Sequence, residues 1–357
     1  MAVKTTSSVK IRWALVLDQV NMLVTVDSLK IYYDVSDGML QAVDDVSFEV
    51  GANEVVGILG ESGGGKSTLA KSIIRDLPQN GRLVSGEIQY KETDLTSVSH
   101  EKIQEIRWDE IACVPQNAMN SLDPVYTIEN QITETISAHR DIPEDKQIAK
   151  AREVLDTVGI DPSRLQDYPH QMSGGMKQRI VLALSLVLDP DLIIADEPTT
   201  GLDVLLRDKI LADIEQYREE FEISILIISH DIADLVETCD RLMVMYGGKI
   251  VEKAPSRELI ASPRHPYTMG LKNSLPAMQS NPDDLVTMSL DPPDLRNPPE
   301  GCRFMSKCPV AIEKCDESHP DFFEFNGAES ACYRAHEAEK IAAEIEHEGF
   351  EVANHDQ

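Results

Sequence analysis

A short glycine-rich stretch of this chain has the composition of a phosphate-binding loop. GESGGGKST fits the pattern G-x-x-x-x-G-K-[ST] and directly follows the apolar run EVVGILG. Glycines let the backbone turn so that several N–H groups and a helix N-terminus face the same phosphate groups. Lys66 would place a positive charge at the β- and γ-phosphates, and the Ser67 hydroxyl would bind Mg²⁺. We therefore predict an ATP site that includes Gly60, Glu61, Ser62, Gly63, Gly64, Gly65, Lys66, Ser67 and Thr68.

Two other apolar runs end in side chains that could act on a phosphate. LIIADEP ends in Asp196 and Glu197, and ILIISHD ends in His230. A parallel sheet presents such residues at the carboxyl edge of its strands, where ligands bind. We expect Asp196 to hold Mg²⁺, directly or through water, and Glu197 to be the base that polarises the attacking water. His230 could reach a γ-phosphate there, although either motif alone would more often be structural.

Four of the six cysteines lie close together in the sequence and could bind metal. They follow the spacing C-x5-C-x6-C-x16-C and are Cys302, Cys308, Cys315 and Cys332. In a reducing cytoplasm such a group is expected to bind metal and not to form disulfides. Zinc sites usually contain a C-x2–4-C pair, which is missing here, whereas four thiolates from loops can hold a [4Fe–4S] cluster. We predict such a cluster as a structural staple, with structural zinc as the alternative and redox sensing as a less favoured role.

The elements that must position these groups alternate between strands and helices. Strand-type runs such as QAVDDVSFEV and EVVGILG occupy the first third, and DLIIAD, ISILIIS and RLMVMYGGKIV follow a helical stretch from about Glu129 to Asp167. This order predicts an α/β fold with a mostly parallel sheet and a helical insertion. After about Pro255 the chain becomes rich in proline, so we expect a weakly cored appended region without neighbouring strands. We expect Cys113 and Cys239, which are isolated in the sequence, to be small buried apolar residues.

The charge of the chain limits its partners. Asp and Glu number 62 against 33 Lys and Arg, for a formal net charge of −29, and the excess is spread along the chain. Nucleic acid is therefore an unfavourable partner, and a diffuse acidic surface suits a cytoplasm of very high salt, as in haloarchaea. The longest uncharged apolar run, Ile180 to Leu188, is about half of what a membrane crossing requires, so a membrane role must depend on partner subunits.

One further stretch identifies the class of phosphate-loop protein. QMSGGMKQR, together with Gly60–Thr68 and Asp196–Glu197, resembles the nucleotide-binding subunits of ABC type, whose signature is usually Leu-Ser-Gly-Gly-Gln. Met172 and Met176 depart from that signature. Its centre is kept, and an opposing γ-phosphate would meet there a hydroxyl, backbone N–H groups and a helix N-terminus, supplied by Ser173, Gly174 and Gly175.

This resemblance implies a P-loop NTPase core of ABC type with a β-subdomain, a helical insertion and an appended C-terminal region that contains the cysteines. It also implies that Tyr33 stacks on adenine, that Gln116 reaches Mg²⁺, that Asp203 belongs to the GLD motif at the nucleotide, and that His230 is the switch histidine. In this family two subunits enclose two ATP molecules, and each site combines one chain's phosphate loop with the other chain's Ser-Gly-Gly. Closure of the two subunits then pulls on membrane partners.

Two more stretches resemble one branch of the family. QNAMNSLDPVYTIENQI and SPRHPYTMGLKNSLP are similar to the dipeptide and oligopeptide importers, a branch that includes nickel importers and carries a proline-rich C-terminal region with a cysteine cluster. The resemblance also points to a [4Fe–4S] cluster. It implies an ATPase at the cytoplasmic face of the membrane. The implied partners are two membrane permease subunits, a second ABC ATPase of either the same or a related chain, and an extracellular peptide-binding protein.

Other functions fit the sequence less well. A nickel importer ATPase is the alternative within the branch. A soluble ABC-type ATPase acting on DNA or ribosomes would show a long heptad coiled coil or a second ATPase domain, which this chain lacks, and the negative charge opposes nucleic acid. A regulatory module that binds ATP without turnover is disfavoured by Glu197 and His230.

The expected domain order follows from these motifs. We expect an N-terminal extension over residues 1–21 and an ATP-binding domain over residues 22–257, with a helical subdomain at about 120–180. A C-terminal region with the four cysteines would cover residues 258–340, and a charged tail residues 341–357. The stretch EAEKIAAEIEHEGFE could form a charged helix, which we expect to be a solvated end.

Overall fold

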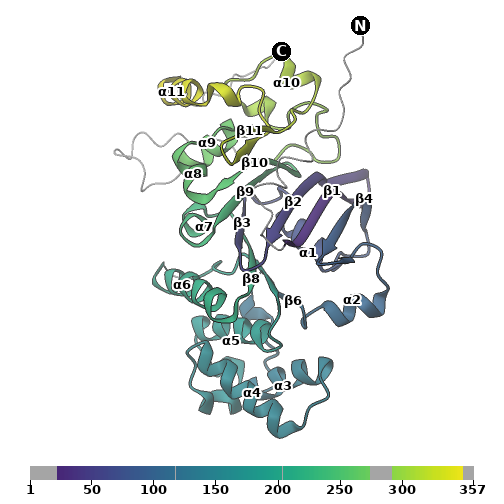
Figure 1. The fold of residues 1–357 in the computed structure, drawn as a ribbon, viewed down its shortest axis with the longest axis vertical. Coiled ribbons are helices and arrows are strands. Elements are labelled where there is room, and N and C mark those ends of the chain that lie inside the picture. The colour runs from purple at the N-terminus through teal and green to yellow at the C-terminus, as the bar shows by residue number, and fades with distance from the viewer. Residues whose placement is uncertain (1–21, 117, 203, 274–291, 349–357) are drawn as a thin grey trace.

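The fold is built on two β-sheets with helices around them (Figure 1). The structure is a computed structural model and describes residues 22–116, 118–202, 204–273 and 292–348. The expected N-terminal extension of residues 1–21 and the expected nucleotide-site residue Asp203 lie outside the described residues.

A mostly parallel sheet forms the centre of the described part of the chain. Its strand order is β11-β12-β10-β9-β3-β8-β7-β6. The strands that run parallel are β3 (Val55–Leu59), β6 (Ile111–Val114), β7 (Leu192–Asp196), β8 (Ser224–Ser229) and β9 (Arg241–Tyr246). Every residue of β3, β7 and β8 is buried, because helices or the second sheet cover both faces. Burial on both faces explains why these strands appear in the sequence as continuous apolar runs.

An antiparallel sheet packs beside the central sheet (Figure 1). Its strand order is β2-β1-β4-β5, with β1 at Met22–Val35, β2 at Gly38–Gly51, β4 at Gly81–Tyr90 and β5 at Thr93–Asp94. In β2 the buried Val46, Phe48 and Val50 alternate with exposed residues, which is the pattern of a sheet with one face in the core. That face shares a hydrophobic cluster with Leu69 and Ile73 of α1 (Lys66–Ile73), so the antiparallel sheet is held close to the start of α1.

Most of the described helices lie before residue 262. The helical insertion lies at the opposite end of the molecule from the C-terminal strands (Figure 1). It contains α3 (Ile128–His139), α4 (Glu144–Thr157), short turns at Pro162–Gln166 and Pro169–Gln171, and α5 (Gly174–Leu186). The other helices of this part are α2 (His100–Ile106), α6 (Val204–Phe221), α7 (Ile232–Thr238) and α8 (Ser256–Ala261). Among the described residues, no helix combines the length and the apolar content that a membrane crossing needs.

The C-terminal region extends the central sheet, so the expectation that it has no neighbouring strands is wrong. β10 (Lys249–Pro255) pairs antiparallel with β9, β12 (Ala328–Ser330) pairs with β10 through Glu252 and Ser330, and β11 (Phe323–Phe325) pairs with β12. The last two strands are too short to show a periodic pattern in the sequence. Short helices at α9 (Pro266–Asn273), Met305–Lys307 and α10 (Lys314–Glu317) complete the region.

The charged helix near the C-terminus forms as expected, but the expectation that it is a solvated end is wrong for its described part. α11 (Ala338–Glu348) buries Ile341 and Ile345, which are four residues apart and share one face, against Met269 of α9. The sequence EAEKIAAEIEHE hides this apolar stripe because charged residues surround it. Residues 349–357 lie outside the described part of the chain.

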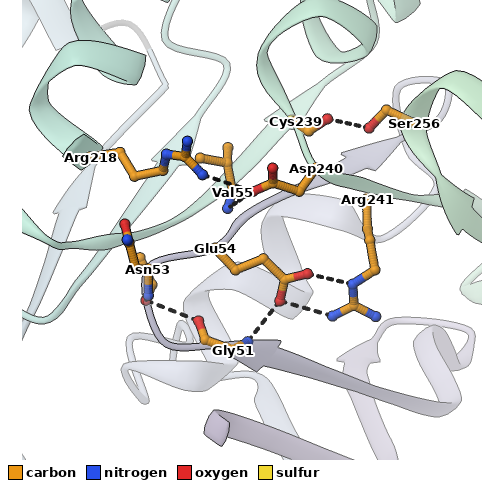
Figure 2. Close-up of polar contacts among 10 residues, drawn as sticks. Gly51, Asn53, Glu54, Val55, Arg218, Cys239, Asp240, Arg241 and Ser256 are labelled. Atoms are coloured by element: carbon orange, nitrogen blue, oxygen red, sulfur yellow. Dashed lines mark hydrogen bonds and ion pairs between the residues drawn. The ribbon is translucent and has the colours of Figure 1, made fainter. Parts of the chain in front are cut away.

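Polar contacts tie the start of β3 to the start of β9 (Figure 2). One oxygen of the Asp240 carboxylate accepts hydrogen bonds from the backbone N–H of Val55 at 2.9 Å and from the Arg218 guanidinium at 3.2 Å. Glu54 accepts from the backbone N–H of Gly51 at 2.8 Å and pairs with Arg241. These bonds give hydrogen-bond partners to the buried backbone N–H groups of Gly51 and Val55, at the end of the sheet opposite the phosphate loop.

Replacing Asp240 with alanine is expected to lower the free energy of unfolding by about 1 to 2 kcal/mol, because the buried Val55 N–H loses its partner. Denaturant unfolding of the full chain measures this change. Asp208→Ala, at an exposed position of α6, is the matched control and should shift the free energy of unfolding by less than about 0.5 kcal/mol. Equal effects of the two substitutions would show that the Asp240 contacts do not stabilise the sheet.

Candidate nucleotide-binding site

The loop between β3 and α1 has the backbone geometry of an anion cradle. Gly63 and Gly65 have φ values of +81° and +99°, in the region that only glycine adopts without strain. A Cβ atom at Gly65 would lie 2.0 Å from the carbonyl oxygen of Ala42, so no larger residue fits. Gly65 is also the residue before the first turn of α1, so the loop ends at a helix N-terminus.

The side chain of Lys66 lies inside this loop. Its Nζ atom donates hydrogen bonds to the carbonyl oxygens of Gly60 at 2.7 Å and Glu61 at 2.9 Å. Burial lowers the pKa of Lys66, and the nearby carboxylates of Glu197 and Asp196 counteract part of this shift. The loop therefore holds a buried cation within reach of the space that a phosphate would occupy, which fits an anionic ligand.

A pair of oxygen ligands suited to Mg²⁺ lies beside the loop. The Ser67 hydroxyl donates a 3.0 Å hydrogen bond to Asp196 at the carboxyl end of β7. Burial raises the pKa of Asp196, although the bond from Ser67 opposes the shift. Hydroxyl and carboxylate oxygens are hard ligands of the kind that Mg²⁺ prefers, so these residues fit the ion that the sequence predicts.

Glu197 is held by three neighbours at the same sheet edge. Its carboxylate accepts hydrogen bonds from Gln116 Nε2 at 2.9 Å and from the Thr200 hydroxyl at 2.9 Å, and it lies 3.2 Å from His230 Nδ1. Burial alone would raise the pKa of Glu197, but the bonds from Thr200, His230 and Gln116 lower it overall. The group is thus an oriented carboxylate that can polarise a water molecule. The sequence analysis did not single out Thr200.

Tyr33 of β1 reaches the same site from the antiparallel sheet. Its hydroxyl is 3.0 Å from the Thr68 hydroxyl in the first turn of α1. Tyr33, the phosphate loop, Gln116 and Glu197 line one cavity of about 570 Å³. This volume lies in the usual range of about 300 to 1,000 Å³ for small-molecule sites. The structure therefore brings the predicted loop, metal and catalytic residues together.

The predicted Ser-Gly-Gly stretch lies elsewhere on the chain. Ser173 caps α5, where its hydroxyl accepts a hydrogen bond from the backbone N–H of Met176 at 3.3 Å. Ser173, Gly174 and Gly175 line a separate open cavity of about 760 Å³, which the phosphate loop does not line. A Cβ at Gly175 would lie 2.6 Å from the Leu206 side chain, so any larger residue there would displace Leu206 of α6.

The four clustered cysteines line a third, small cavity together with His265 and Phe304. Burial raises the pKa of Cys302 to about 11 and the pKa values of Cys308 and Cys332 to about 12. All four are free thiols. Among the described residues, no group of three or more His, Cys, Asp or Glu side chains is arranged to hold a metal ion. Cys239 is buried as expected, whereas Cys113 is only partly buried.

The C-terminal region contributes residues to the nucleotide site that the sequence analysis missed. The Tyr267 hydroxyl of α9 accepts a 3.0 Å hydrogen bond from the backbone N–H of Glu61 in the phosphate loop. The segment 292–295 lines the same cavity as the loop. More than two hundred residues separate these positions from the loop. Tyr267 lies in the stretch SPRHPYTMGLKNSLP noted above, but nothing in that stretch indicates a contact with the phosphate loop. For residues 292–295 the sequence showed only a high proline content, which indicated irregular structure.

Comparison with known proteins agrees with this arrangement. The family model described as "ABC transporter" matches residues 43–200, and the model described as "Oligopeptide/dipeptide transporter, C-terminal region" matches residues 251–315. The dipeptide transport ATP-binding protein DppD of Caldanaerobacter subterraneus subsp. tengcongensis is 39% identical, over 88% of this chain and 97% of its own length. The oligopeptide transport ATP-binding protein AppD of Bacillus subtilis is 38% identical, over 84% of this chain and 92% of its own.

Solved structures share the fold. CbiO1 of Clostridium perfringens, part of an ABC transporter complex, has a TM-score of 0.60 at 28% identity, covering 68% of this chain and 91% of its own. The dimeric ATP-binding cassette MJ0796, solved with ADP and Pi, has a TM-score of 0.59 at 24% identity, covering 66% of this chain and 99% of its own, and shows the fold alone. The predicted ABC-type fold is thereby confirmed. The chain belongs to the family of ABC transporter ATP-binding subunits, in its dipeptide and oligopeptide transporter branch, and is an ATPase of that family.

Proposed function

We propose that this chain hydrolyses ATP to drive the import of dipeptides or oligopeptides through partner membrane subunits. The observation that carries the proposal is the common edge of β3, β7 and β8, where Lys66 and Glu197 line one cavity and Asp196 accepts a hydrogen bond from Ser67 of the same lining. Relatives named as dipeptide or oligopeptide transport ATP-binding proteins align over most of the chain, including the C-terminal region.

The proposed chemistry assigns one task to each group at that edge. The loop amides and Lys66 bind the β- and γ-phosphates, and Ser67, Asp196 and Gln116 would hold Mg²⁺, which would supply positive charge at the phosphates. Glu197 polarises the attacking water, because its carboxylate is ionised and oriented by Thr200 and Gln116. His230, which is half-exposed beside Glu197, senses the γ-phosphate. Tyr33 stacks on the adenine ring, and Asp203 belongs to the adjoining GLD motif.

We further propose that hydrolysis requires a second ATPase chain, either an identical copy or a paralogue. Ser173, Gly174 and Gly175 line a cavity apart from this chain's own phosphate loop, so they are available to a γ-phosphate held by another chain. The related cassette MJ0796 was solved as a dimer, which agrees with such an arrangement.

The remaining proposed partners are two membrane permeases and an extracellular peptide-binding protein, which place the chain at the cytoplasmic face of the membrane. Large apolar side chains exposed beside the helical insertion support a docking role there: Val125 is 70% exposed and Tyr126 is 49% exposed. The strongly negative charge supports the absence of nucleic acid among the partners. It also supports adaptation to concentrated salt, as in haloarchaea, because screening removes the repulsion between surface carboxylates.

We also propose that Cys302, Cys308, Cys315 and Cys332 hold a [4Fe–4S] cluster, with structural zinc as the alternative. The support is that thiols from separate turns line one cavity. The thiols would have to move toward a common ligand, since no metal-binding group is formed by the described residues as they stand. A bound cluster would supply crosslinks to the C-terminal region, and its thiols would lose the protons that burial now retains.

Glu197→Gln is expected to keep ATP binding and to lower ATP turnover at least about a hundredfold, because an amide cannot polarise water as a carboxylate does. Steady-state ATPase assays beside nucleotide titrations measure both properties. The variant should also form a long-lived dimer with ATP, and adding Ser173→Arg should prevent that dimer while the chain still binds ATP. Near-normal turnover of Glu197→Gln would reject this residue as the catalytic group.

Lys66→Ala is expected to weaken ATP binding itself by at least about tenfold, because the loop loses its charge-assisted contact to the phosphates. Calorimetric titration of the full chain with ATP tests this. The control is Lys71→Ala, an exposed residue of the same helix that does not line the cavity. Similar ATP affinities for the two variants would remove Lys66 from the binding site.

Anaerobically purified protein is expected to contain about four irons and four sulfides per chain and to absorb visible light. Metal and sulfide analysis beside absorption spectra tests the cluster. Cys308→Ser should lower the thermal stability of the C-terminal region, whereas ATP binding at Lys66 should change little. Stoichiometric zinc in a colourless, folded protein would overturn the cluster in favour of the zinc alternative.

A further inference from the structure

The nucleotide cavity has one wall that comes from the C-terminal region. Besides the phosphate loop, Gln116 and Glu197, its lining includes Tyr33, Leu40 and Ala42 of the antiparallel sheet and the segment Pro292 to Leu295, here called the proline wall. The proline wall belongs to the proline-rich stretch that the sequence presents as an irregular appendage. Its position raises the question of what it contributes to ligand binding.

The proline wall packs closely against the phosphate loop and a neighbouring turn. A Cβ atom built at Gly63 would lie 3.4 Å from Cγ of Pro292, so the first proline ring lies against the loop. A Cβ atom at Gly247, in the turn between β9 and β10, would lie 3.2 Å from Cδ of Pro293. Both prolines therefore pack against glycines with positive φ values, where any other residue would strain the backbone.

Backbone and side-chain bonds hold the proline wall to the antiparallel sheet. The carbonyl oxygen of Leu295 accepts a 2.8 Å hydrogen bond from the backbone N–H of Gln41 in β2, and Leu295 is buried. The Asp294 carboxylate pairs with Arg296, whose guanidinium also lies 3.8 Å from Asp37 in the turn between β1 and β2. The segment is thus fixed to the strand whose neighbouring residues Leu40 and Ala42 line the cavity.

A buried arginine anchors the chain that follows the proline wall. Arg303 is 3% exposed and donates hydrogen bonds to Gln41 Oε1 at 2.8 Å, to Asp44 Oδ2 at 2.6 Å and to the carbonyl oxygen of Gly247. Gln41 therefore contacts the C-terminal region twice, through its backbone at Leu295 and through its side chain at Arg303. Removing one partner of a buried ion pair is costly, so this anchor keeps the proline wall in place.

The cavity is lined by two chemically different groups of residues. Lys66, Ser67 and Glu197 make one part polar and charged, as phosphates and a metal ion require. Away from these groups the lining includes Asp294 and a set of apolar surfaces, which are the ring of Tyr33, Leu40, Ala42, two proline rings and Leu295. Apolar and aromatic surfaces bind a flat, uncharged base well, whereas they offer nothing to a phosphate.

We propose that the proline wall, together with Tyr33, forms the binding site for the nucleoside part of ATP, so that the C-terminal region is a component of this chain's own nucleotide site. The proposal rests on the nucleotide site proposed above and adds a contact with the base and ribose. Arg303 is a positioning residue in this scheme, because it holds the proline wall through Gln41 and Asp44 and does not line the cavity itself.

The test separates the nucleoside from the phosphates. The full-length protein is titrated with ATP and, separately, with inorganic tripolyphosphate, which carries the phosphates without a base. The double variant Pro292→Ser/Pro293→Ser is expected to bind ATP about five- to tenfold more weakly, because apolar contact with the nucleoside is lost. Its affinity for tripolyphosphate should stay within about twofold of the unaltered protein, because the phosphate loop is unchanged and its ligand has no base.

The control and the second variant use the same two ligands. Pro298→Ser/Pro299→Ser changes two prolines of the same stretch that do not line the cavity, and it should leave both affinities unchanged. Arg303→Met should weaken ATP binding but not tripolyphosphate binding, and Arg303→Lys should restore part of the ATP affinity because it keeps a cation beside Asp44. Retained tripolyphosphate binding shows in each case that the phosphate loop is still folded.

Two results would overturn the proposal. Unchanged ATP affinity in Pro292→Ser/Pro293→Ser would show that the proline wall does not contact the nucleoside. An equal loss for ATP and tripolyphosphate would show that the C-terminal region acts only by shaping the phosphate loop. If the unaltered protein bound neither ligand, the nucleotide site itself would be wrong, which is a different failure from either of these.

Discussion

The fold depends on the alignment of strand ends in the central parallel sheet. β3 pairs with β8 so that Leu59 lies beside Ser229, and β7 pairs with β8 so that Asp196 lies beside Ile228. The phosphate loop, the carboxylate pair and His230 therefore follow three neighbouring strands at one edge. A shift of one residue in any of these registers would move a polar group away from the cavity, and it would also reverse the side chains of a buried strand.

Electrostatics at that edge favour a ligand that brings both a cation and phosphate. Lys66 and Asp196 are buried close together beside the partly buried Glu197, and burial raises the pKa of Asp196 while it lowers the pKa of Lys66. Lys66 and Asp196 thus each lie in an environment that disfavours their charged form, whereas the hydrogen bonds to Glu197 favour its ionised form. The net charge of the chain is −29, so its surface as a whole repels anions. The loop amides and Lys66 nevertheless create a local site of opposite sign.

The C-terminal region is integrated into the ATPase core and is not a separate appendage. Its strands β11 and β12 extend the central sheet, Tyr267 contacts the phosphate loop, and Arg303 bonds to Asp44 of the antiparallel sheet. Phe304 links these contacts physically to the cysteines, because it lines their cavity and packs against Tyr267 with ring centres 5.5 Å apart. Packed side chains therefore connect the cysteine cavity with the phosphate loop through Phe304 and Tyr267.

The sequence by itself determined the parts of this protein that local chemistry dictates. The glycines, lysine and serine of the phosphate loop must be adjacent in the sequence to form a cradle, so the loop was recognisable as a short pattern. Strands buried on both faces must be continuously apolar, so β3, β7 and β8 were recognisable as apolar runs. The tertiary structure alone decided which distant segments join them. β12 is three residues long, the apolar stripe of α11 is hidden among charges, and residues 292–295 reach the cavity only because Gln41 and Asp44 bond to Leu295 and Arg303. Such contacts depend on packing between residues far apart in the chain, for which no local spacing exists.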